Sequence, residues 1–172
     1  FPLTPTQLGM RAGVLRADAP GAYHEQIVVD LDEELEPRLL ARAWEHVVQS
    51  HGALRTTFVV PDDGAPLQVV HDTVSLDVRE VDLRPLEPSQ RASHFEALRA
   101  EDVARPFDLA SVPLARITLA RVEQRYWRML WSFPHLVLDG RSFALVLGDL
   151  FRAYDALLDG ELPPLIESPS FR

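Results

Sequence analysis

The 172-residue sequence contains no cysteine, which excludes disulfide bonds, thiolate metal sites and a cysteine nucleophile. It also has no apolar run near the roughly 20 residues that a membrane-spanning helix needs. No signal peptide precedes its first motif. These absences fit a reducing compartment, and they predict a cytoplasmic protein that does not bind a membrane.

Positive charge is also scarce, since 17 Lys and Arg residues face 26 Asp and Glu residues, for a net charge of −9. The basic residues form no run, and affinity for a phosphate backbone comes from clustered cations. We therefore expect no nucleic-acid partner. The six histidines show no spacing typical of metal ligands, so we expect no metal site either.

The remaining composition is that of an ordinary globular domain, with 47% hydrophobic and 25% charged residues. Apolar periodicity and turn signals predict strands at residues 26–31, 53–60, 67–70, 76–83, 114–122 and 125–133. They predict helices from Thr4 or Thr6 to Arg16, from Pro37 to Gly52, from a Ser89 cap to about Ala104, and from about 141 to Leu158. Long crossovers and tight hairpins both occur. We therefore expect an α/β (α+β) two-layer sandwich, a mixed β-sheet with helices packed on it, in one domain.

The stretch that organises the rest of the chain is SFPHLVLDG, at residues 132–140. It follows a run with aromatic or sulfur side chains at every second position, which is typical of a buried strand. Pro134 should end that strand, because proline lacks the N–H that a ladder needs. His135 and Asp139 are then expected in a strand-to-helix turn, where functional residues are common.

Each residue of this turn also has a structural interpretation. A single histidine after a buried strand is often a packed, hydrogen-bonded side chain rather than a catalyst. An aspartate before Gly-Arg-Ser at a helix start is a natural N-cap, so Asp139 need not act in chemistry. Gly140 fits a position that needs backbone freedom or a close approach to a substrate. Sequence pattern alone leaves these alternatives open.

The pattern His135-x-x-x-Asp139-Gly140 resembles the active-site motif of the condensation domains of nonribosomal peptide synthetases, relatives of chloramphenicol acetyltransferase. That motif usually begins with two consecutive histidines, and Pro134 stands where the first is expected. Further similar motifs occur in the same order: LTPTQLGM at 3–10, SHGALRTTF at 50–58, ARPFDL at 104–109 with PLAR at 113–116, and FRAYD at 151–155. The resemblance covers nearly the whole chain.

The resemblance implies half of a two-lobed enzyme. Its motifs stop after the first lobe, so residues 1–160 are expected to form the amino-terminal, chloramphenicol acetyltransferase-like lobe. Residues 161–172 are expected to be a proline-rich tail or linker toward the second lobe. The active site of such a domain lies between the lobes.

The resemblance also implies residue roles. His135 would be the catalytic residue, as a general base or an orienting group. Asp139 would hold the loop by pairing with an arginine, for which Arg55, Arg141 or a residue of the second lobe is a candidate. Gly140 and Pro134 would support the same loop. Substrate-binding residues are not assigned, and the loss of the first histidine makes an inactive or specialised domain more plausible.

The implied reaction joins a donor acyl or peptidyl thioester to an acceptor aminoacyl thioester through an amide bond. Both substrates would arrive on the 4′-phosphopantetheine arms of peptidyl carrier proteins, and the domain itself would need no cofactor. The alternatives are a degenerate domain that only binds carrier-tethered intermediates and a related acyltransferase that uses an alcohol acceptor or a coenzyme A thioester. An epimerisation domain of the same type is a further alternative.

Overall fold

The computed structural model describes residues 1–14, 23–62, 64–161 and 164. Its helices are α1 (Pro5–Val14), α2 (Pro37–Ser50), α3 (Pro88–Val103) and α4 (Ser142–Leu158), with a short 3-10 helix, η1 (Gly52–Arg55), after α2. Its strands are β1 (His24–Asp32), β2 (Thr56–Val59), β3 (Leu67–Val70), β4 (Val78–Asp82), β5 (Arg116–Arg121) and β6 (Tyr126–Pro134).

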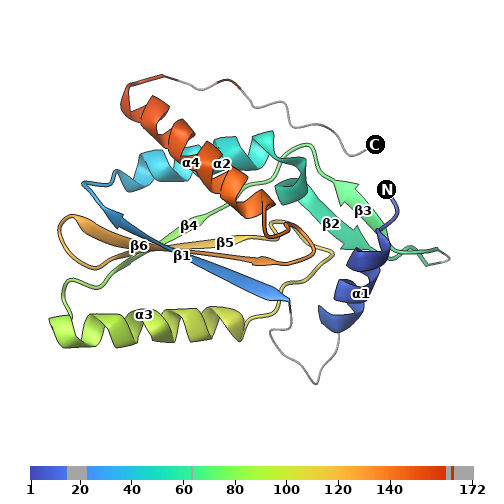
Figure 1. Cartoon of the computed structure of the whole chain (residues 1–172), viewed down its shortest axis with the longest axis horizontal. Helices are drawn as coiled ribbons and strands as arrows, with labels where there is room; N and C mark the ends of the chain where they lie inside the picture. The colour runs from blue at the N-terminus through green and yellow to red at the C-terminus, as the bar shows by residue number, and fades with distance from the viewer. Residues whose placement is uncertain (15–22, 63, 162–163, 165–172) are drawn as a thin grey trace.

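The main sheet has the strand order β1-β6-β5-β4 and is mixed. Strand β6 pairs antiparallel with β1 and β5, whereas β4 pairs parallel with β5. Helices α2 and α4 cover one face of this sheet and α3 covers the other (Figure 1). The expected mixed sheet with helices packed on it is confirmed; because α3 lies opposite α2 and α4, there are three layers instead of two. Strands β2 and β3 form a separate antiparallel hairpin beside α1.

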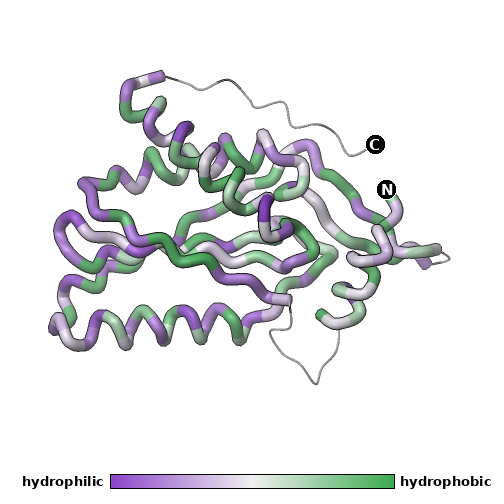
Figure 2. Tube along the Cα trace, in the orientation of Figure 1, coloured by the Kyte–Doolittle hydropathy of each residue, from purple (hydrophilic) through white to green (hydrophobic). Residues whose placement is uncertain are grey.

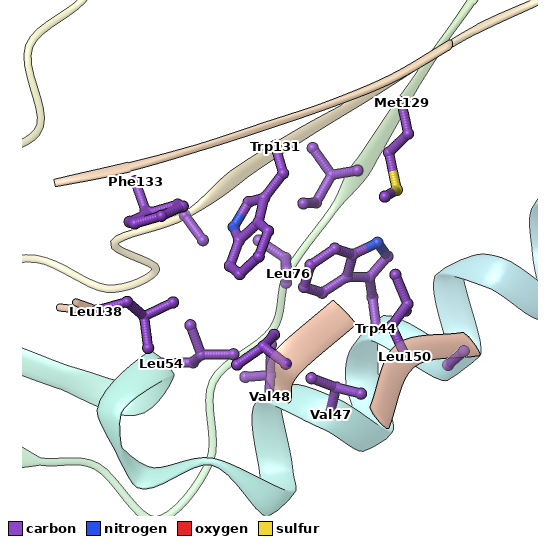
Figure 3. Close-up of a cluster of buried hydrophobic side chains, with 14 of the residues drawn as sticks. Trp44, Val47, Val48, Leu54, Leu76, Met129, Trp131, Phe133, Leu138 and Leu150 are labelled. Carbon is purple, nitrogen blue, oxygen red and sulfur yellow. The ribbon is translucent and has the colours of Figure 1, made fainter. Parts of the chain in front are cut away.

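The core is divided between the two faces of β6, because successive side chains of a strand point to opposite faces. Met129, Trp131 and Phe133 face α2 and α4 and are at most 2% exposed. Leu130 packs with Phe95 of α3 on the opposite face. Figure 3 shows the larger cluster, and Figure 2 shows apolar residues following the central strands and the helices above them. The alternating run before Pro134 therefore fills both cores.

The strongly periodic elements lie where the sequence predicted them. Helix α2 begins at Pro37 and buries five of its six expected stripe residues: Leu40, Ala43, Trp44, Val47 and Val48. Leu39 packs partly buried against the same core. The β5–β6 hairpin, the β2–β3 hairpin and the end of α4 at Leu158 are likewise confirmed.

Two local predictions are wrong. The expected strand at residues 53–60 begins only at Thr56, because Gly52–Arg55 form the 3-10 turn η1. Helix α3 begins at Pro88 after Glu87, so Ser89 lies inside the helix and is not its cap. Proline at the first helical position needs no N–H partner, which favours the earlier start.

The first helix is capped at Thr4, one of the two expected positions. Thr4 Oγ1 accepts the N–H of Gln7 at 3.3 Å, and Gln7 Oε1 accepts the N–H of Thr4 at 3.0 Å, which is a reciprocal capping box. Arg16 and the loop expected at 17–21 lie outside the described residues. So does the expected tail at 161–172, except Glu161 and Pro164.

Candidate active site

His135 lies directly beyond the end of β6, in the exit loop that Pro134 predicted. Its backbone N–H donates to the Tyr23 carbonyl at 2.7 Å, so the loop remains tied to the residue before β1. The next three residues, Leu136, Val137 and Leu138, are buried in the core. The His135 side chain itself is 30% exposed. Its backbone is therefore fixed on both sides while its imidazole reaches the surface.

Glu25 is the charged neighbour of the His135 ring, with its Oε1 3.9 Å from His135 Nδ1. The strand register explains this proximity. Glu25 lies opposite Phe133, which places its side chain on the same sheet face as His135 and diagonal to it. A carboxylate on this side leaves Nε2 as the nitrogen available for a reacting group.

Pro134 does not interrupt the pairing of β6 with β1. Because the N–H of His135 points to Tyr23 on the β1 side, the backbone nitrogen of residue 134 points away from β1. Proline at this position thus removes no hydrogen bond between the two strands. Its carbonyl accepts the N–H of Val137 at 2.9 Å, which turns the chain after His135.

Asp139 lies at the start of α4, where its Oδ1 accepts the N–H of Arg141 at 3.0 Å and of Ser142 at 2.8 Å. Hydrogen bonds from Ser142 and from the Arg141 N–H hold the pKa of Asp139 below its usual range. Gly140 has no atom of the described chain within 4 Å of where a Cβ would stand, and its φ is not left-handed. The glycine therefore leaves open space beside the loop.

Replacing Asp139 with alanine should lower the free energy of unfolding by about 1 kcal/mol, because two N–H groups at the start of α4 lose their acceptor. Urea unfolding of the full chain measures this loss. Asp139→Asn is the matched control, since its side-chain carbonyl can still accept both bonds; it should lose about half as much or less. An equal loss in both variants would contradict capping as the source.

Arg55 does not meet Asp139. Its guanidinium donates to the carbonyls of His71 and Asp72 instead, which ties η1 to the end of β3. Within the described part of the chain, no ion pair joins Asp139 to an arginine. The arginine partner suggested for Asp139 in this chain is therefore not found at Arg55.

His51, in the second similar motif, forms the C-cap of α2 and bonds the buried Asp149 of α4 at 2.7 Å. Asp149 also pairs with Arg152. This pair links the two helices that cover one face of the sheet. The structural interpretation of His51 agrees with this contact, although its partner could not be found from local sequence.

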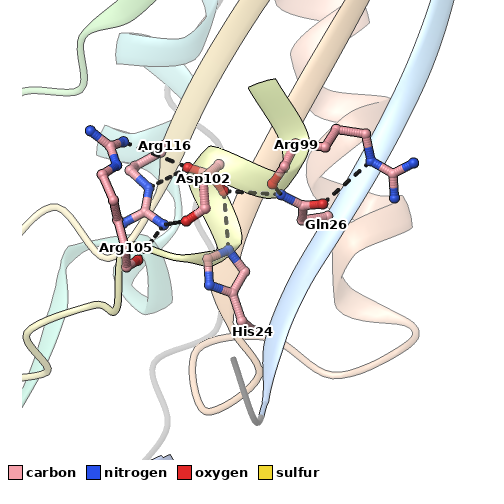
Figure 4. A network of polar contacts seen from close by, with 6 residues as sticks. All are labelled: His24, Gln26, Arg99, Asp102, Arg105 and Arg116. Carbon is pink, nitrogen blue, oxygen red and sulfur yellow. Dashed lines mark hydrogen bonds and ion pairs between the residues drawn. The ribbon is translucent and has the colours of Figure 1, made fainter. Parts of the chain in front are cut away.

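A buried polar cluster on the other face of β1 and β6 was also missed (Figure 4). Its centre is Asp102 at the end of α3, which accepts hydrogen bonds from His24 and Gln26 of β1 and from Arg116 of β5. Arg105 lies 3.6 Å away. No sequence signal brings these residues together, because they come from three separate elements.

Metal ligands and membrane spans were also sought. Among the described residues, no group of three or more His, Asp or Glu side chains could hold a metal ion. None of the helices in the same part of the chain is long and apolar enough to cross a bilayer.

Solved structures with this fold are condensation domains. The starter condensation domain of rhizomide synthetase RzmA matches with a TM-score of 0.86 and 22% identity, over 97% of this chain and 41% of that chain. The first condensation domain of the calcium-dependent antibiotic synthetase, in complex with substrate analogue 2a, also matches with a TM-score of 0.86 at 22% identity, over 98% of this chain and 40% of that one. At this identity the likeness establishes the fold.

A family model described as Condensation domain matches residues 1–172, and the chain belongs to this family. The linear gramicidin synthase of Brevibacillus parabrevis provides a relative that is 38% identical over 161 residues, which are 94% of this chain and 2% of that protein. Bacitracin synthase 1 of Bacillus licheniformis is 29% identical over 161 residues, 94% of this chain and 3% of that protein. The chain thus spans a small part of these relatives and about two fifths of the solved condensation domains.

Proposed function

We propose that residues 1–160 are the amino-terminal lobe of a condensation domain in nonribosomal peptide biosynthesis, with residues 161–172 leading to its second lobe. The domain joins a donor acyl or peptidyl thioester to an acceptor aminoacyl thioester. Peptidyl carrier proteins present both substrates on 4′-phosphopantetheine arms, so these proteins and the second lobe are its partners. The domain itself carries no cofactor.

The observation that carries this proposal is the placement of His135. Its backbone is fixed by the Tyr23 carbonyl and by three buried residues, yet its imidazole is partly exposed. No hydrogen bond from the described residues occupies its Nε2. A histidine with a fixed backbone and a free ring nitrogen suits proton transfer or the orientation of a substrate amine.

The reaction follows from this arrangement. The acceptor amine attacks the carbonyl carbon of the donor thioester, which forms a C–N bond and a tetrahedral species. His135 Nε2 takes the excess proton from nitrogen, the C–S bond breaks, and the proton passes to the departing thiolate. A thioester is already activated, so much of the rate comes from holding the two substrates together.

Pro134 favours a second candidate function, in which the domain binds carrier-tethered intermediates without joining them. The described geometry supports the active form more strongly, because Pro134 removes no hydrogen bond between β1 and β6. Of the related reactions, an alcohol acceptor or a coenzyme A thioester would use the same histidine.

The test uses the intact two-lobed domain with donor and acceptor loaded on their carrier proteins and mass spectrometry of the carrier-bound product. His135→Ala should reduce the rate of amide formation about 100-fold, the range of a lost general base. His94→Ala, at an exposed histidine of α3, is the control and should leave the rate unchanged.

Two results would contradict the proposal. A His135→Ala domain with the wild-type rate would remove His135 from the chemistry. A wild-type domain that binds loaded carriers without product, and gains activity through Pro134→His, would establish the binding function instead.

A further inference from the structure

The cluster around Asp102 holds the strand end that carries His135, but from the opposite face of the sheet. Asp102 Oδ2 lies 3.1 Å from His24 Nε2 and 3.1 Å from Gln26 Nε2. Asp102 Oδ1 accepts the Nε–H of Arg116 at 2.6 Å, and Arg116 also donates to the carbonyls of Asp102 and Arg105. The carboxylate thus joins β1, α3 and β5 (Figure 4).

This cluster is buried and ionised. Asp102 is 7% exposed, and the His24 side chain is 5% exposed. Burial alone would raise the pKa of Asp102, but hydrogen bonds from His24 and Arg116 hold it well below its usual range. An ionised carboxylate only accepts hydrogen bonds, so His24 must be the donor in its contact with Asp102.

His24 lies between this cluster and the candidate active site. It stands directly opposite Pro134 in the β1–β6 register. Residues 23 and 135 form a hydrogen-bonded pair, so residues 24 and 134 form the closer, non-hydrogen-bonded pair, with neighbouring side chains. The His24 ring also packs against Phe107, with 5.2 Å between the ring centroids.

Tyr23 completes the connection. Its backbone has a φ of 60°, which is unusual for a bulky residue and persists only where its surroundings impose it. This conformation presents the Tyr23 carbonyl to the N–H of His135. The Tyr23 ring lies over Gly13 of α1, where an added Cβ would clash with it. On its carboxyl-terminal side Tyr23 is followed directly by the buried His24, which anchors this end of β1 to Asp102.

We propose that His24 is a positioning residue for His135: by donating to Asp102, it fixes the left-handed Tyr23 and the carbonyl that holds the His135 backbone. The kinetic part of this inference rests on the proposed function, but the structural part does not. His24 touches no reacting group. It acts only through the short segment from Tyr23 to His24 and the hydrogen bond to His135.

Hydrogen exchange of the His135 amide, measured by NMR on the full chain, tests the structural part. His24→Leu removes the donor and keeps an apolar side chain against Phe107, and it should speed this exchange about tenfold through local opening. His24→Gln, which retains a donor of similar reach, should restore slow exchange. If His24→Leu does not fold, His24→Asn, whose shorter amide cannot reach Asp102, takes its place.

Gln26→Leu is the matched control, because Gln26 donates to the same Asp102 oxygen at the same 3.1 Å from the same strand. It should destabilise the chain as a whole without speeding exchange at His135 more than about twofold. A purely structural cluster would instead respond equally to both substitutions. That result, or unchanged exchange in His24→Leu, would overturn the inference.

The intact domain tests the kinetic part. His24→Leu should lower kcat about tenfold with little change in KM, since a misplaced histidine affects the reacting geometry more than substrate binding. Faster exchange at His135 in a domain that forms no product would support the role of His24 and reject only the proposed function. Faster exchange with an unchanged kcat in an active domain would overturn the positioning role.

Discussion

Replacing Asp102 with alanine is expected to lower the free energy of unfolding of the full chain by about 3–5 kcal/mol. The substitution leaves the Arg116 guanidinium without its carboxylate and leaves the donors of His24 and Gln26 without an acceptor. Removing one member of a buried ion pair is costly because the remaining charge has already lost its hydration. Urea unfolding at neutral pH measures the loss.

The neighbouring Glu101 provides the control for this experiment. It pairs with Arg79 at 3.5 Å, but both side chains are about half exposed. Exposed pairs contribute little, so Glu101→Ala should cost no more than about 0.5–1 kcal/mol. Similar losses at the two positions would show that burial of the Asp102 cluster does not govern its contribution.

The effect of Asp102 should also depend on pH in one direction. The pKa of Asp102 is held well below its ordinary value of 3.8, so the unfolded chain takes up this proton at a higher pH than the folded chain. The stability that Asp102 contributes is therefore complete above about pH 5 and is lost as the pH falls below 4. The difference between wild type and Asp102→Ala should be constant from pH 5 to 7 and should narrow in acid. A difference that widens in acid would contradict this sign.

Elements with strong local signals could be predicted from the sequence. Helix α2 has a proline at its start and a continuous apolar stripe, and β6 has large side chains at every second position. In both, local preference and tertiary packing favour the same structure. Residues 53–55 lack such agreement: they precede a β-branched run, but they form a 3-10 turn whose Arg55 bonds the end of β3.

The candidate site divides in the same way. His135, Asp139 and Gly140 are contiguous in sequence, so their placement in a strand-to-helix turn followed from Pro134 and the α4 periodicity. Contacts between elements did not. His24 and Asp102 are 78 residues apart, and nothing local marks either as buried or paired. The same limit applies to His51 and Asp149, which are 98 residues apart.

The second large effect is expected at Trp131, where alanine should lower the free energy of unfolding by about 3–5 kcal/mol. Trp131 is fully buried between the sheet and helix α2. Its ring contacts Trp44 at a centroid distance of 5.0 Å and Phe133 at 4.7 Å (Figure 3). Removing this ring leaves a large cavity among side chains that are already close-packed, and urea unfolding measures the cost.

Trp131→Phe separates the volume of the ring from its polar atom. The indole N–H of Trp131 is buried and has no hydrogen-bond partner among the described residues, so phenylalanine removes no hydrogen bond made within this part of the chain. Loss of an unsatisfied donor offsets part of the lost packing, and the variant should be destabilised by only about 1–2 kcal/mol. A loss as large as that of Trp131→Ala would show that the N–H has a partner or that the indole shape is required.

Trp131 also bears on the candidate site, because it lies four residues before His135 on the same strand and on the same face. Its packing against α2 fixes the strand from the side opposite the Asp102 cluster. Weakening either contact should therefore destabilise the chain, but only the His24 contact leads directly to the carbonyl that holds His135. Trp131→Phe should consequently leave hydrogen exchange at the His135 amide within about twofold of wild type. A tenfold increase would mean that general loosening of β6, without any specific role for His24, is enough to release the histidine.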